Sequence, residues 1–190
     1  RPRATDKDSR ISASEAQLLQ TTNDLTLRGV VQLERWSKPM DTTNPDTTLR
    51  TGRAEWNLDS GLLNAKGPVL AQRRDQEGTV LEQLQGQSVQ GNTRVGDLVV
   101  MAPVTVRMPR QKGILKAQDT TWNFRTQIVR TELPFEAELD RTRIFGKAFQ
   151  AELNKTTVLI QGDCRIQQPG ESLDATTCRW NWGTEEVLAE

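Results

Sequence analysis

The chain has 190 residues, 35% of them hydrophobic, and 25 basic side chains balance 25 acidic ones. A zero net charge lacks the basic excess that nucleic-acid binding needs. Histidine is absent, which removes the commonest general base, the nucleophile pairs that depend on it and most catalytic zinc sites. We therefore expect a protein that is not an enzyme and that uses no cofactor and no metal.

Carboxylate pairs are the acid–base groups that remain. The candidates are Glu136 with Glu138 and Glu185 with Glu186. They flank apolar positions of predicted strands, and charges placed there usually only solvate the outer face. We interpret them as surface charges.

The N-terminal segment, residues 1–11, begins with a run of charged residues, and we predict that it is disordered. Residues 12–190 are predicted to form a single elongated domain. Ser12 to Glu15 also fit a capping box that would open a short helix through Leu19. The same residues fit the strand repeat that dominates the rest of the chain.

That repeat is built on tryptophan and asparagine. The triplet Trp56-Asn57-Leu58 returns as Trp122-Asn123-Phe124 and as Trp180-Asn181-Trp182. Each triplet puts large apolar side chains at i and i+2, which is typical of a strand with one buried face. An apolar pair follows each tryptophan after six or seven residues, so each triplet predicts a hairpin. Weaker copies near Leu18 and Leu153 bring the number of arguable repeats to five.

A third apolar element follows several hairpins, usually after a glycine or a proline. Its anchors Val69, Val104, Phe135 and Cys164 lie 35, 31 and 29 residues apart. Periods of this size indicate stacked units, none of which buries its apolar face alone. Threonine pairs recur and long helical patterns are missing, so we predict an all-β fold of repeated antiparallel strand pairs.

The two cysteines, Cys164 and Cys178, bracket a turn-like segment and are symmetric about residue 171. A hairpin centred there would place them opposite each other, close to disulfide range. We predict a disulfide if the compartment is oxidising. The alternative is a pair of small buried apolar residues on adjacent strands.

Apolar and polar residues alternate along the predicted strands, as in residues 104–108 and 133–139. Two facing sheets of such strands would enclose a long apolar slot. If side chains fill the slot, it is an ordinary sandwich core. If the slot is wide, it is open to a lipid tail, and periodicity alone leaves both interpretations in place.

A longer pattern resembles a known family. The pattern is Ala54-x-Trp56-x-Leu58-x-x-x-x-Leu63-x-Ala65-x-Gly67-x-Val69, echoed by residues 25–31 and 157–164. It resembles the repeats of the OstA-like periplasmic proteins of lipopolysaccharide transport, which include LptA, LptC and the N-terminal domain of LptD. The likeness runs from about residue 12 to the end. The length, the tryptophan content and the irregular spacing fit an enlarged LptC of a divergent lineage such as cyanobacteria better than a short LptA.

The resemblance implies a twisted, partly open β-jelly roll that holds the acyl chains of lipopolysaccharide and passes them from an inner-membrane ABC transporter toward the outer membrane. It implies a periplasmic protein of outer-membrane biogenesis, tethered to the inner membrane by an N-terminal anchor outside the printed sequence. Other OstA-like bridge proteins would join by edge-strand pairing. The expected lipid-binding residues are Trp56, Leu58, Val69, Val104, Val106, Trp122, Phe124, Phe135, Ile160, Trp180 and Trp182.

Two other interpretations compete with lipid binding. A carbohydrate-binding or adhesin-like β module would use each tryptophan and its asparagine as a stacking platform for sugar rings, and a purely structural repeat would bind no ligand. Exposure of the indoles distinguishes the carbohydrate-binding module from the other interpretations, because a sugar platform needs its indoles in solvent. A lipid slot and an ordinary core both bury them.

Overall fold

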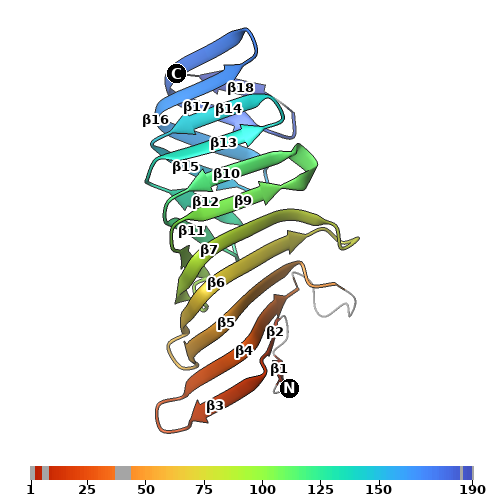
Figure 1. The fold of residues 1–190 in the computed structure, drawn as a ribbon, viewed down its shortest axis with the longest axis vertical. Helices are drawn as coiled ribbons and strands as arrows, with labels where there is room; N and C mark the ends of the chain where they lie inside the picture. Colours follow the sequence, from red (N-terminus) through yellow and green to blue (C-terminus); the bar gives the residue numbers. More distant parts are fainter. Residues whose placement is uncertain (1–2, 6–8, 37–43, 185, 190) are drawn as a thin grey trace.

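A computed structural model describes residues 3–5, 9–36, 44–184 and 186–189. Within those ranges the chain forms eighteen strands and one short 3-10 turn, η1 (Pro109–Gln111), which confirms the predicted all-β fold. The strands are β1 (Arg3–Thr5), β2 (Ser9–Ser12), β3 (Glu15–Leu19), β4 (Asp24–Arg35), β5 (Thr47–Asn57), β6 (Leu62–Arg74), β7 (Val80–Asn92), β8 (Asp97–Val100), β9 (Val104–Met108), β10 (Gly113–Ala117), β11 (Thr120–Asn123), β12 (Ile128–Thr131), β13 (Phe135–Leu139), β14 (Thr142–Gly146), β15 (Ala148–Glu152), β16 (Thr157–Gln168), β17 (Glu171–Asn181) and β18 (Glu186–Ala189). They stack along the long axis of an elongated, twisted molecule, in an order that largely follows the sequence (Figure 1).

The long strands bend in the middle, and β4, β7 and β16 each change a partner at the bend. Before its bend β4 pairs with β3, and after it β4 pairs with β2, always antiparallel. In some places two short strands take the position of one long bent strand. Next to β7, for example, β8 pairs with the C-terminal end of β7 and β9 pairs with its N-terminal part. The continuous sheet therefore folds over into two half-sheets that face each other.

The first half-sheet contains β3, β8, β11, β12, β15 and β18, and the second contains β2, β9, β10, β13 and β14. The bent strands β4, β5, β6, β7, β16 and β17 give one arm to each half-sheet. The bends close one side of the molecule, and the hairpin turns at the ends of the arms lie on the other side. This arrangement is the predicted β-jelly roll, built from antiparallel strand pairs and incompletely closed.

Glycines with a left-handed backbone form several of the bends. Gly29, Gly67 and Gly162 have φ angles of +83°, +92° and +68°, a region that glycine enters without steric cost. The strand register shifts at the same three places. Val31, Val69 and Cys164 each lie two positions after one of these glycines, and all three are buried. Val104 and Phe135 directly follow Pro103 and Pro134, and both are also buried. The anchors that the sequence predicted to be equivalent therefore occupy one structural position, just beyond the bend.

Each tryptophan–asparagine triplet ends a strand at a hairpin, as predicted: Asn57 ends β5, Asn123 ends β11 and Asn181 ends β17. The Oδ1 atom of each asparagine accepts backbone N–H groups of its own turn. The Nδ2 atom of Asn57 donates across to the preceding hairpin, to the carbonyl of Thr22 at 3.0 Å and to Asp24 Oδ1 at 2.8 Å. Turn formation and turn-to-turn contact therefore explain the asparagine of the motif.

Backbone hydrogen bonds also link each hairpin to the one before it. Leu58 N–H donates to the carbonyl of Asn23 at 2.9 Å, and Trp182 N–H donates to that of Thr156 at 3.0 Å. A further hairpin, between β7 and β8, lacks a tryptophan and uses Asn92 in the same way, because Asn92 Oδ1 accepts from the N–H of Arg94 at 2.8 Å. It stands where the sequence repeat is hardest to recognise.

The N-terminal segment departs from the prediction of disorder, because it contains β1 and β2. β2 pairs with the end of β4, with Ile11 opposite Leu33. Ile11 is 8% exposed, so its burial explains why a charged segment adds to the sheet. Residues 1–2 and 6–8 lie outside the described residues, and the domain boundary at residue 12 stays a prediction. The alternative helix through Leu19 is wrong, since those residues form β3.

The structure joins Cys164 and Cys178 in a disulfide, with 6.0 Å between their Cα atoms. The hairpin is not centred on residue 171, because Gln168 pairs with Glu171 across the turn. Cys164 therefore lies opposite Ala175, and Cys178 lies opposite Ile160. The two cysteines meet because β16 and β17 bend between these positions, at the register shift after Gln161.

One of the two predicted pairs of surface carboxylates lies on the outer face of the sheet, as expected. Glu136 and Glu138 alternate along β13 with the buried Phe135, Ala137 and Leu139, so they face outward. Glu185 lies outside the described residues. Across the described ranges we find no helix with the length and hydrophobicity that crossing a membrane requires.

Candidate functional site

The interior between the two half-sheets contains two apolar cavities in a row. The first, of about 110 Å³, lies in the C-terminal half and is lined mainly by aliphatic and aromatic side chains of β9, β10 and β12 to β17. The second, of about 260 Å³, lies in the N-terminal half between β4, β5, β6 and β8. Residues of both half-sheets line each cavity, so both cavities lie inside the roll.

Trp122 stands between the two cavities and lines both of them. Its side chain is 5% exposed and packs against Phe124, with the ring centroids 6.4 Å apart in an edge-to-face arrangement. Within the described residues its indole Nε1–H has no hydrogen-bond acceptor. Trp122 is therefore the side chain that the linings of the two cavities have in common.

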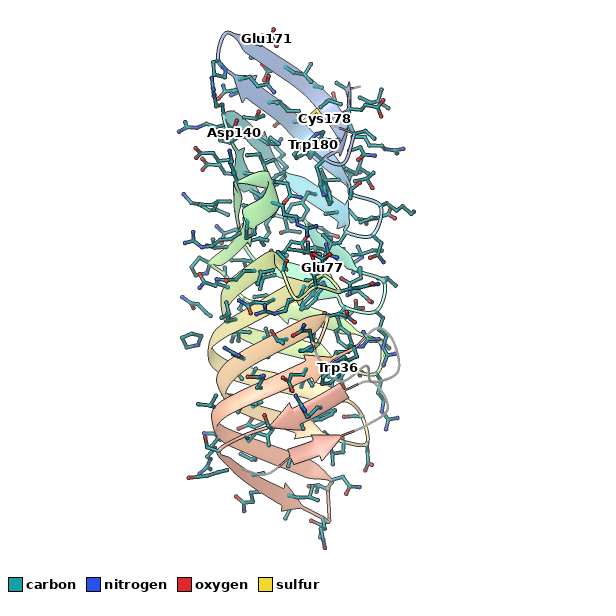
Figure 2. The ribbon with its side chains drawn as sticks, turned by 90° about the vertical axis from the view of Figure 1, so that its right-hand side faces the viewer. Trp36, Glu77, Asp140, Glu171, Cys178 and Trp180 are labelled. Atoms are coloured by element: carbon teal, nitrogen blue, oxygen red, sulfur yellow. A yellow bond between two sulfur atoms is a disulfide. The ribbon has the colours of Figure 1, made fainter. Side chains whose placement is uncertain are left out.

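Nine of the eleven expected lining residues reach a cavity. In the C-terminal cavity the expected residues are Val106, Phe135, Ile160, Trp180 and Trp182, in the N-terminal cavity they are Trp56, Leu58 and Phe124, and Trp122 belongs to both. Figure 2 shows Trp180 in the C-terminal half near Cys178, two residues away on the same strand. Binding of lipid by these residues stays a prediction.

Val69 and Val104 are the two expected residues that line neither cavity. They are 2% and 1% exposed and lie just beyond a bend, where the two half-sheets meet. These two valines belong to the packed core, whereas Val31 and Phe135, in the same position just beyond a bend, do reach a cavity. The sequence could not separate them from lining residues, because the same alternation marks both.

The tryptophans face inward, as a slot or a core requires. Trp36 and Trp122 are buried, and Trp56, Trp180 and Trp182 are only partly exposed while lining a cavity. The indole N–H of Trp56 donates to Thr93 Oγ1 at 3.2 Å. With their asparagines engaged in turns, these residues do not present the exposed platform that sugar stacking needs.

A third pocket, of about 320 Å³, lies on the open side of the roll and has a different character. It is lined by Arg35, Asp46, Thr47, Arg73, Arg74, Phe124, Arg125, Gln127 and Asn154. Arg35, Thr47, Phe124 and Arg125 also line the N-terminal cavity, and Arg73 also lines the C-terminal one. We call this pocket the arginine mouth, since four arginines line it and it shares lining residues with both apolar cavities.

Sequence reasoning missed the arginine mouth. Its arginines are scattered along the chain at the ends of β4 and β6 and in the turn after β11, without a shared motif. The sequence also missed lining residues outside the tryptophan triplets, among them Met108, Leu115, Leu139, Ile144 and Phe149. Their alternation was visible, but the direction of each bend decides which of them reach the open space.

Perturbed charges elsewhere belong to exposed pairs. Hydrogen bonds from Arg53 and then Lys66 hold the pKa of Glu55 below its ordinary value. A hydrogen bond from Lys147 lowers the pKa of Asp163 in the same way. Both carboxylates lie on the outside of bends or strands, so these shifts report surface pairing and mark no reactive group.

Comparison with protein-family models and with curated proteins found no match for this sequence. Among solved structures, the chain is similar to the crystal structure of LptH, described as the LptA homologous periplasmic component of the conserved lipopolysaccharide transport device from Pseudomonas aeruginosa. The TM-score is 0.26 at 12% sequence identity, and the match covers 96% of this chain and 82% of that chain. So low a TM-score does not establish a common fold.

Proposed function

We propose that this protein is a periplasmic lipopolysaccharide carrier that holds acyl chains between its two half-sheets. The observation that carries the proposal is the pair of apolar cavities in a row inside a jelly roll that is closed by bends on one side and open at the turns on the other. An ordinary sandwich core would fill this space with side chains. The repeat pattern that resembles the OstA-like family agrees with the same function.

The proposed mechanism is physical transfer without a chemical step. Each methylene group that stays out of water retains about 0.8 kcal/mol, so an acyl chain can leave a bilayer for the slot with little net loss. The open side lets the sugar head group remain in solvent while the chains lie inside. Direction and energy would come from the partner, an inner-membrane ABC transporter that delivers the lipid toward the outer membrane.

The ends of the roll offer edges for the next component. β3 pairs only with β4, and β18 pairs only with β17, within the described residues. Large apolar side chains are exposed on both edge strands, with Leu19 54% and Leu188 68% exposed. We infer that other OstA-like bridge proteins add strands there and continue the slot.

The proposed location is the periplasm, an oxidising compartment in which the disulfide between Cys164 and Cys178 would persist. Among the family's members we infer the LptC type, enlarged and tethered to the inner membrane, from the length, the tryptophan content and the irregular repeat spacing of the chain. Expression of the full-length gene product with membrane fractionation tests the tether.

Binding of intact lipopolysaccharide, compared with the polysaccharide released from it by mild acid, tests the proposed function. Each is titrated into the protein while tryptophan fluorescence is recorded. We expect the intact molecule to change the emission of the inward indoles and the polysaccharide to leave it unchanged. Binding of the polysaccharide alone would favour a carbohydrate-binding module, and binding of neither would favour a purely structural core.

A further inference from the structure

We propose that the arginine mouth binds the anionic head group, phosphate or carboxylate, of the amphiphile whose chains occupy the slot. This inference rests on the proposed function, because it assigns the place of the head group at the same site.

The mouth lies where a head group would emerge. Arg35 ends β4 and Arg74 ends β6, both in the second half-sheet, whereas Arg125 belongs to the turn between β11 and β12 in the first. The pocket therefore spans the open side, opposite the bends. Since it shares lining residues with both apolar cavities, chains in either cavity can reach a head group placed there.

Contacts across the open side hold the mouth in shape. The Nη1 atom of Arg35 donates to the carbonyl of Phe124 at 2.9 Å, joining the two half-sheets. The Phe124 ring packs against two guanidinium groups, with the Cζ atoms of Arg35 and Arg125 at 5.0 and 5.9 Å from its centroid. Because these contacts already fix the side chains, less conformational entropy is lost when an anion binds.

The mouth has an excess of positive charge in a chain whose net charge is zero. Asp46 is its one lining carboxylate among the described residues. Glu82, which lines the neighbouring cavity, pairs with Arg73 through two contacts of 2.6 Å. Arg74 and Arg125 form no ion pair within the described part of the chain.

Among the residues that the structure describes, the side chains of Arg74 and Arg125 hydrogen-bond only to uncharged groups, and these bonds leave donors available. Arg74 donates to the carbonyl of Gly78 at 2.9 Å and to Gln72 Oε1 at 2.7 Å, and Arg125 donates to the carbonyl of Thr93 at 3.3 Å. A guanidinium has five N–H donors in a planar fork that matches phosphate or carboxylate oxygens. Two such forks from opposite half-sheets suit an anion between them.

The test uses dodecyl phosphate and dodecyl maltoside, which share an alkyl chain and differ in head-group charge. Their dissociation constants are measured below micelle-forming concentrations for the wild type and for the double variant R74Q/R125Q. The matched control is R107Q/R130Q, which removes the same charge from exposed positions outside the mouth. Circular dichroism and urea unfolding establish that the variants stay folded.

We expect R74Q/R125Q to weaken dodecyl phosphate binding by about tenfold or more, because hydrogen bonds between two charged groups are roughly twice as strong as those between neutral ones. Dodecyl maltoside binding and both affinities of the control should stay within about twofold of the wild type. In the wild type, added salt should weaken dodecyl phosphate binding and leave dodecyl maltoside binding unchanged, a readout that requires no variant.

Equal loss in both double variants, or none in either, would overturn the assignment while leaving the slot in place if dodecyl maltoside still binds. Inorganic phosphate that binds as tightly as dodecyl phosphate would also overturn it, because the mouth would then be a site for free anions. Failure of both amphiphiles to bind the wild type would overturn the proposed function together with this inference.

Discussion

Replacing Phe135 with alanine tests which face of the sheet is inside. Phe135 is 7% exposed, lines the C-terminal cavity and contacts the Phe149 ring edge-to-face, with the centroids 4.9 Å apart. Truncation of a buried phenylalanine costs about 3–5 kcal/mol, and the aromatic contact lies within that range. Because Phe135 already borders open space, we expect a value near the lower limit, about 3 kcal/mol.

Phe145 is the matched control, since it lies on the adjacent strand β14 and is partly exposed on the opposite face. Full burial of such a side chain contributes about 1.5–3 kcal/mol, so truncation of one that is only partly buried on the outer face should cost about 1 kcal/mol. Urea unfolding followed by tryptophan fluorescence measures both variants, with equal m values as the condition for comparison. If F145A cost as much as F135A or more, the assignment of the inward face would be refuted.

Three further predictions concern the disulfide, a bend and a turn. The disulfide closes a sequence separation of 14 residues, so C164A/C178A should lose about 3 kcal/mol against the oxidised protein in urea unfolding, and a difference that persists under reducing conditions would contradict this cause. Gly67→Ala should cost about 1–2 kcal/mol because its φ is +92°, whereas Gly52→Ala, equally free of neighbours within 4 Å and without a positive φ, should change stability by less than about 0.5 kcal/mol. Hydrogen bonds from Thr22 and Asn57 lower the pKa of Asp24, so its contribution to stability is present above the ordinary aspartate pKa and is lost as pH falls through the lower folded value. Thr22→Val should raise the Asp24 pKa in NMR titration, and an unchanged pKa would contradict this account of the turn.

The hairpins and bends could be predicted because each depends on local chemistry. A tryptophan two positions before a second apolar residue marks a strand end, and an asparagine such as Asn57 satisfies the turn that follows. A glycine such as Gly67 marks a bend because few other residues adopt its positive φ. These signals lie within a few residues of one another, so the sequence displays them directly.

The site could be predicted only in part, because it depends on how distant segments face one another. Val69 and Val106 show the same alternation, yet the bend places one in the core and the other beside open space. The cysteines were matched correctly although the hairpin centre was wrong, since the bend in β16 and β17 compensates for the shifted register. Arg35 and Arg125 meet across the open side only after the sheet has folded over, which no local pattern records.

Site-specific photocrosslinking tests most directly whether acyl chains lie between the half-sheets. A benzophenone amino acid is placed at Val106, which lines the C-terminal cavity, and separately at Arg107, the next residue of β9, which is exposed on the opposite face. After irradiation with lipopolysaccharide, we predict a lipid adduct in the variant at residue 106 and none in the variant at residue 107. Adducts at both positions, or none at residue 106 in a protein that remains folded, would contradict the account.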